Sequence, residues 1–279
     1  MIHTSRQLKA LVRNIAKGDS AKAQIIIRNY VTERFLERLS LSQYRSNLIL
    51  KGGTLIAAMV GLDNRSTMDV DTTLKKMPLN ETTVRTIVDD IIAVQLEDGM
   101  TFEIQSVSQI MEGADYPGIR LTLDAILENM HTPLKIDFSA NDVITPREMP
   151  FAFRLSFEDR TIPVLAYNLE TILSEKLETL LSRSTANTRM RDFYDIHVLI
   201  NTPTQCIDNT TLKKAFIGTC NKRGSLVLLP NMDLILQEIA ESSSLAALWK
   251  SYQRKYQYAS KVSWNDVIKS VRALAEIVK

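Results

Sequence analysis

The chain has few of the residues that mark a disulfide-rich, zinc-binding or membrane protein. Its 279 residues include two cysteines, Cys206 and Cys220, which excludes a disulfide scaffold and fits a reducing cytoplasm. Its three histidines show no zinc-ligand spacing, and nothing indicates a nucleophilic triad. No apolar run approaches the roughly 18 residues of a membrane span, and the N-terminus lacks the apolar segment of a signal peptide. We therefore expect a cytoplasmic protein without a membrane segment.

The composition is that of a globular protein, with 45% hydrophobic and 24% charged residues. The net charge of +2 is unevenly distributed. Residues 1–45 contain nine Lys or Arg and three Asp or Glu, and residues 250–279 contain seven Lys or Arg and two Asp or Glu. These ends carry net charges of +6 and +5, so the middle carries −9. Basic ends around an acidic middle suggest a polyanion held at the ends and a carboxylate-rich site between them. Solvated helix faces would produce the same pattern.

Hydrophobic periodicity predicts an α+β fold with a small mixed sheet. Helices are expected over about 5–46, 55–60 and 81–97, and from Asn168 to the end of the chain. Strands are expected at 47–50, 69–74, 102–107, 118–123, 134–139 and 163–167, with a connection at Pro146 and Pro150. The predicted domains are an N-terminal helical extension (1–46), a core (47–167) and a helical C-terminal domain (168–279).

Two short motifs suggest phosphate and metal chemistry. Asp69 and Asp71, two residues apart on a strand, point to one side with their Cα atoms about 6–7 Å apart, so both can reach one Mg²⁺. Upstream, Gly52-Gly53 permits close approach of backbone N–H groups to a phosphate, and the Thr54 hydroxyl adds a donor. Each motif alone is weak, because an Asp-x-Asp pair is more often solvated and a Gly-Gly pair is usually a turn. Their combination favours a nucleoside triphosphate site.

A calcium-binding loop is excluded by spacing. Counting from Asp63, the sixth residue is Met68 rather than Gly, and the twelfth is Leu74 rather than Glu.

Three further residues extend the candidate site, each with a structural alternative. Asp137, on the predicted strand 134–139, provides a third carboxylate that completes the metal shell or takes the proton from an attacking hydroxyl. Its structural alternatives are a salt bridge with Lys135 or an exposed strand position. Lys176 flanks the apolar stripe of its helix, where a lysine either meets an anion or extends its amine to solvent. Arg65 either contacts phosphate or pairs with a carboxylate.

Together these motifs resemble a known enzyme family. Gly52-Gly53-Thr54 is followed by Arg65-Ser66-Thr67-Met68-Asp69-Val70-Asp71, then Lys135-Ile136-Asp137-Phe138, Glu175-Lys176-Leu177 and Arg191-Asp192-Phe193-Tyr194-Asp195. Their order and approximate spacing resemble the AbiEii/AbiGii abortive-infection toxin nucleotidyltransferases and their mycobacterial MenT relatives, within the polymerase-β-like superfamily. The motifs span about 51–195, roughly half of the chain.

The resemblance implies a toxin of a toxin–antitoxin or phage-defence system, with a polymerase-β-like core, that uses Mg²⁺ or Mn²⁺. Such an enzyme transfers a nucleoside monophosphate from a nucleoside triphosphate to an acceptor hydroxyl and releases pyrophosphate. The implied acceptor is the 3′ end of transfer RNA, and the implied partner is a cognate antitoxin. A protein hydroxyl as acceptor, or a non-catalytic module that binds RNA or a partner, remains an alternative.

The resemblance also implies a role for each matching residue. Asp69, Asp71 and Asp137 would be the metal ligands. The implied phosphate-binding residues are Gly52, Gly53, Thr54, Arg65, Thr67 and Lys176. Asp192 and Asp195 belong to a final acidic helical motif, and which of them is essential stays open.

A basic, aromatic segment lies near the C-terminus, from Trp249 to Tyr258. Its rings are suited to stacking unpaired RNA bases. Because Trp249, Tyr252 and Tyr256 fall at helical spacing, we favour a packed stripe with the basic residues outside.

Overall fold

The computed structural model describes residues 1–110, 118–203 and 206–279. The chain divides into two compact units. The first comprises Met1–Ala58, Ser66–Asp142 and Met149–Ala166, and the second comprises Met59–Arg65, Val143–Glu148 and Tyr167–Lys279. The N-terminal helices therefore share a unit with the sheet.

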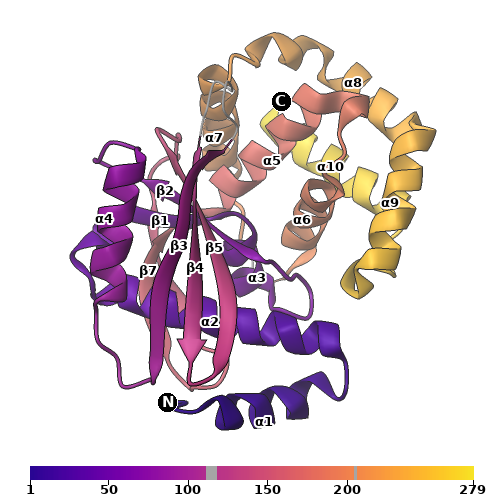
Figure 1. The fold of residues 1–279 in the computed structure, drawn as a ribbon. Helices are drawn as coiled ribbons and strands as arrows, with labels where there is room; N and C mark the ends of the chain where they lie inside the picture. The colour runs from indigo at the N-terminus through magenta and orange to yellow at the C-terminus, as the bar shows by residue number, and fades with distance from the viewer. Residues whose placement is uncertain (111–117, 204–205) are drawn as a thin grey trace. The chain divides into compact units, whose positions relative to one another are not determined.

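A mixed sheet forms the centre of the first unit. Its strands are β1 (Leu48–Lys51), β2 (Asp69–Leu74), β3 (Met100–Ile110), β4 (Gly118–Leu127), β5 (Met130–Ala140), β6 (Met149–Arg154) and β7 (Thr161–Ala166). They are arranged in the order β3-β4-β5-β2-β1-β7-β6, and Figure 1 shows β3, β4 and β5 as long neighbouring strands. The pairs β2/β5 and β1/β7 are parallel and the others antiparallel. The predicted α+β class with a mixed sheet is confirmed.

The helices of this unit pack on the sheet or on one another. They are α1 (Ser5–Ala16), α2 (Ser20–Leu41) and α4 (Glu81–Ile92), with a 3-10 turn, η1 (Gln43–Ser46), and α3 (Gly52–Val60), which begins in this unit. Helix α2 contacts β5 and β7, and α4 contacts β3 and β4 (Figure 1). Helix α4, expected over 81–97 from its hydrophobic periodicity, buries an apolar stripe made of Val84, Ile87, Val88 and Ile91. Periodicity therefore identified the face of this helix that packs on the sheet.

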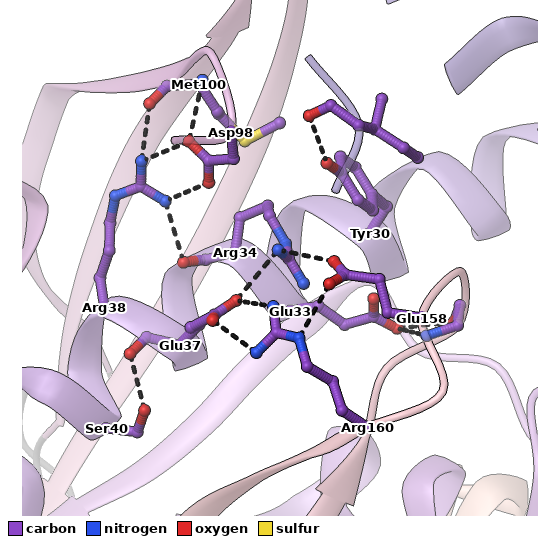
Figure 2. A network of polar contacts seen from close by, with 12 residues as sticks. Tyr30, Glu33, Arg34, Glu37, Arg38, Ser40, Asp98, Met100, Glu158 and Arg160 are labelled. Atoms are coloured by element: carbon purple, nitrogen blue, oxygen red, sulfur yellow. Dashed lines mark hydrogen bonds and ion pairs between the residues drawn. The ribbon is translucent and has the colours of Figure 1, made fainter. Parts of the chain in front are cut away.

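Helix α2 is buried on all sides in its second half, because every residue from Tyr30 to Ser40 is buried. The charged side chains in this half pair with one another and with residues of loops (Figure 2). Arg34 lies 3.0 Å from Glu37 and 3.2 Å from Glu158. Arg38 donates to both oxygens of Asp98, at 2.7 and 2.9 Å. Charges withdrawn from water need such partners, so part of the basic N-terminal charge lies inside the protein.

One strand was missed. We expected a connection at Pro146 and Pro150, whereas Pro150 lies in β6, opposite Leu165 of β7. Proline lacks the N–H that a central strand must donate, but β6 is the edge strand of the sheet, where one side needs no donor. The prediction of an irregular connection was therefore right at Pro146, which lies outside the strands, and wrong at Pro150.

The second unit is helical. It contains α5 (Leu169–Arg183), α6 (Met190–Asn201), α7 (Asn209–Lys222), α8 (Met232–Glu241), α9 (Ser243–Lys255) and α10 (Trp264–Val278), with 3-10 turns η2 (Ser184–Ala186), η3 (Leu226–Asn231) and η4 (Gln257–Ala259). Asn168 caps α5 as expected, since its side chain accepts a bond from the Thr171 N–H at 2.9 Å. Helix α5 packs against α6 and α7, and α10 packs against α6. Across the described ranges, no helix combines the length and apolar character needed to cross a membrane.

The aromatic segment of α9 is packed, as favoured above. Trp249 and Tyr252 are buried and stack with ring centroids 5.4 Å apart. The Trp249 indole N–H donates to the Val262 carbonyl at 3.0 Å. Tyr256 is half-buried, and its hydroxyl accepts a bond from Arg191 at 2.9 Å.

Candidate active site

Strand pairing brings the three predicted carboxylates to one face of the sheet. Asp71 of β2 lies directly opposite Asp137 of β5 in the parallel register. Asp69 precedes Asp71 by two residues on the same strand, so its side chain lies on the same face. The register continues outward to Lys51 of β1, opposite Asp71, and to Arg120 of β4, opposite Asp137. Two acidic side chains therefore lie between two basic ones in a row across four strands.

The glycine pair fits closely against this row. Gly52 begins α3 directly after β1 and has φ +62°, in the left-handed region that favours glycine. A Cβ placed on Gly52 would overlap the Asp71 carboxylate. The Gly53 N–H donates to Asp71 Oδ2 at 3.2 Å. The glycine pair thus leaves room for the Asp71 carboxylate and orients it, a role that was not expected from the sequence.

Two threonines of the predicted phosphate-binding set hold the start of β2. The hydroxyls of Thr54 and Thr67 donate to the same backbone carbonyl, that of Asp69, at 3.0 and 3.3 Å. Thr54 is buried. Both side chains thereby fix the strand that carries the first two carboxylates, and their contact with phosphate stays a prediction.

The electrostatic environment of Asp71 favours a cation. Burial raises the pKa of its carboxyl, and the negative charges of Asp137 and Asp69 add to the effect, whereas the Gly53 N–H and Lys51 oppose it. Lys51 itself forms an ion pair with Asp142. An added cation would relieve the repulsion among the three carboxylates.

Arg120 is a site residue that the sequence reasoning missed. Its Nε and Nη2 donate to the two oxygens of Asp137, each at 2.7 Å. The alternative that Asp137 pairs with Lys135 was therefore wrong about the partner, because Lys135 is an exposed neighbour on the same strand. The β4–β5 hairpin, closed by Glu128 and an Asn, sets the register and places the two residues opposite each other. This two-residue turn is the feature of the sequence from which the pairing of Arg120 with Asp137 could have been predicted.

The donor chemistry of this row fits a divalent cation such as Mg²⁺ or Mn²⁺. Asp69, Asp71 and Asp137 supply carboxylate oxygens from adjacent strands, the ligands that hard cations prefer. Within the described part of the chain, however, no three acidic, histidine or cysteine side chains form a ready-made metal-binding group. Both oxygens of Asp137 instead meet Arg120.

The remaining predicted residues form a second cluster, in the helical unit. Lys176 of α5 places its Nζ 2.7 Å from Asp192 and 2.7 Å from Asp195, both on α6. Arg65 lies 2.6 Å from the other oxygen of Asp195. Arg189 adds a contact to Asp192 at 3.0 Å. Of the two roles considered for Arg65, the pairing with a carboxylate is confirmed.

Mutual pairing keeps this cluster ionised despite its burial. Burial alone would lower the pKa of Lys176, but Asp192 and Asp195 outweigh it and raise the pKa. Burial would likewise raise the pKa of Asp195, but Lys176 and Arg65 hold it well below its usual range. Lys176 therefore remains a cation in a fixed position.

Comparisons with known proteins agree with this description. A family model described as "Nucleotidyl transferase AbiEii toxin, Type IV TA system" matches residues 34–274. A proposed nucleotidyltransferase from Helicobacter pylori has a similar structure, with a TM-score of 0.52 and 14% identity over 91% of this chain and 94% of its own. JHP933 from Helicobacter pylori gives a TM-score of 0.51 and 15% identity over 91% of both chains. Among curated proteins, none matches. The chain belongs to the AbiEii nucleotidyltransferase toxin family of type IV toxin–antitoxin systems, and it is a nucleotidyltransferase.

Proposed function

We propose that this enzyme transfers a nucleoside monophosphate from a nucleoside triphosphate to an acceptor hydroxyl and releases pyrophosphate, in a reaction that depends on Mg²⁺ or Mn²⁺. The observation that supports this most strongly is the register of Asp71 opposite Asp137, with Asp69 on the same face. These three side chains would hold the metal, and Asp137 is also the candidate base for the acceptor hydroxyl. When bound, the metal would neutralise phosphate charge and align the reacting phosphorus.

The glycine pair prepares this row of carboxylates. The Gly52-Gly53 turn leaves room for Asp71 and orients it through the Gly53 N–H. In our proposal Lys176 contacts the nucleotide phosphates, and Asp192 and Asp195 keep it charged and oriented. Arg65 contributes by holding Asp195.

For the acceptor we propose the 3′ end of transfer RNA, and for the partner a cognate antitoxin. Support comes from the excess of basic residues in 1–45 and 250–279, because neutralising phosphates dominates affinity for nucleic acids. Two of the N-terminal basic residues, Arg34 and Arg38, are buried and do not contribute.

The acceptor can be identified directly. Purified protein is incubated with α-labelled nucleoside triphosphates, Mg²⁺, total RNA and a cell protein extract, and the labelled species are separated by size and by nuclease treatment. We expect label in RNA of transfer-RNA size with the wild type and none with Asp69→Asn. The matched control is Asp89→Asn, which removes an exposed carboxylate from α4 and should label like the wild type.

The other outcomes separate the alternatives. Label in the protein fraction would mean that the acceptor is a protein hydroxyl and not RNA. No label in either fraction, with cellular toxicity unchanged by Asp69→Asn, would overturn the transfer reaction in favour of a binding role.

A further inference from the structure

The row across four strands has basic side chains at its ends, Lys51 and Arg120, and two carboxylates between them. Arg120 uses two parallel donors on the two oxygens of Asp137, each at 2.7 Å. A guanidinium in this geometry makes the strongest kind of carboxylate hydrogen bond. A divalent cation bound to the same carboxylate would lie close to the guanidinium and be repelled by it. Arg120 and a metal therefore compete for Asp137.

Solvent exposure distinguishes this ion pair from the structural ones. The side chains of Arg120 and Asp137 are 35% and 19% exposed. In the buried pair Arg65–Asp195 the values are 2% and 0%. A partly exposed pair costs less to separate than a buried one, because water can solvate both charges once they part. Of these two pairs, Arg120–Asp137 is therefore the one whose partners exchange at the lower cost.

Released from Asp137, the Arg120 guanidinium has an anionic partner in the substrate. Its planar fork of donors matches phosphate oxygens as well as carboxylate oxygens. It also extends from the strand beside β5, so it needs to move only its flexible side chain.

We propose that Arg120 is a triphosphate-binding residue that exchanges partners: it pairs with Asp137 until metal and nucleotide bind, then donates to phosphate oxygens while Asp137 turns to the metal. This inference rests on the proposed function, because it assumes that the row binds a metal and a nucleoside triphosphate. It identifies Arg120 as the residue that couples the two binding events.

The exchange predicts effects of opposite sign in one variant, Arg120→Gln. Binding of Mn²⁺ alone is measured by the electron paramagnetic resonance signal of the free ion. Binding of α,β-methylene nucleoside triphosphates, each tested separately with Mn²⁺, is measured by calorimetry. We expect Mn²⁺ alone to bind about tenfold more tightly to the variant, and the best-bound analogue about tenfold more weakly, each equivalent to one lost charged contact.

Two further variants show whether the effect passes through Asp137. Arg85→Gln removes the same charge from α4, where the side chain is 57% exposed, and should change neither affinity. The double variant Arg120→Gln/Asp137→Asn should bind Mn²⁺ no more tightly than Asp137→Asn alone, because the carboxylate for which Arg120 competes is gone. Arg120→Lys, which keeps the charge but lacks the paired donors, should give intermediate shifts and serves if Arg120→Gln folds poorly.

Each contrary result overturns the exchange. If Mn²⁺ affinity is unchanged or weaker in Arg120→Gln, Arg120 does not compete with the metal. If only the Mn²⁺ affinity changes, Arg120 does not reach the triphosphate. If the wild type labels an acceptor but Arg120→Gln gives either of these results, the proposed function stands and the exchange does not. Wild-type protein that binds neither Mn²⁺ nor any analogue contradicts both.

Discussion

The carboxylate of Asp71 occupies the space that any side chain at Gly52 would need. Gly52→Ala must therefore displace Asp71, in addition to straining a backbone with φ +62°. Because misplacing a catalytic group by about 1 Å can cost about 100-fold in rate, we expect at least that loss in nucleotidyl transfer. Initial rates of label incorporation measure it.

A matched glycine separates the overlap from the strain. Gly224 has φ +66°, and a Cβ there would have no atom within 4 Å. Gly224→Ala should therefore lose stability by about 1–3 kcal/mol with near-normal transfer. Equal rates for the two variants would contradict the claim that Gly52 is needed to make room for Asp71.

In the second cluster, Asp195 should matter more for stability than Asp192. Asp195 is fully buried between Arg65 and Lys176, whereas Asp192 shares Lys176 with Asp195 and otherwise meets the exposed Arg189. Removing one partner of a buried ion pair costs about 3–5 kcal/mol, so we expect that loss for Asp195→Ala and a smaller one for Asp192→Ala. Urea unfolding at pH 7 measures both, and a larger loss for Asp192→Ala would refute this ranking.

Glu33 predicts a dependence of stability on pH. One of its oxygens accepts bonds from the backbone and hydroxyl of Ser156, at 3.0 and 2.6 Å, and from Asn29. The other is buried without a hydrogen-bond partner among the described residues. Burial raises the pKa of Glu33 from 4.5 to about 7, against the bonds from Ser156 and the charge of Arg34.

The raised pKa determines the sign of the effect. Below about pH 4.5 the folded and unfolded states are both protonated at Glu33; between 4.5 and 7 only the folded state keeps the proton, so stability falls as the pH rises. The total loss is about 3 kcal/mol. Glu33→Gln cannot ionise and therefore lacks this loss. The free energy of unfolding of the variant minus that of the wild type should rise by about 3 kcal/mol between pH 4.5 and pH 8. A difference that does not vary with pH would contradict the assignment.

Much of the fold was predictable because local patterns determine it. The apolar stripe of α4, the cap at Asn168 and the alternation of β2 each depend on neighbouring residues. The strand β6 was missed because proline in a strand is acceptable only at a sheet edge, and the edge is known only from the full strand order.

The candidate site was predictable in its acidic residues and not in their partners. Asp69 and Asp71 are two residues apart, so the sequence alone places them on one face. The pairing of Arg120 with Asp137 depends on the register of a hairpin, and that of Arg38 with Asp98 joins a helix to a loop 60 residues away. A sequence pattern reports which side chains share a face, but not which distant charge each of them meets.

Labelling the two ends of the triphosphate separately distinguishes transfer of the nucleoside monophosphate from transfer of the terminal phosphate. Protein, total RNA and a cell protein extract are incubated with nucleoside triphosphate labelled at the α-phosphate or, in parallel, at the γ-phosphate. We predict label in the acceptor from the α-position alone, pyrophosphate carrying the γ-label, and loss of both signals in Asp71→Asn but not in the control Asp89→Asn. Acceptor labelling from the γ-position, or undiminished labelling by Asp71→Asn, would contradict nucleotidyl transfer at this row of carboxylates.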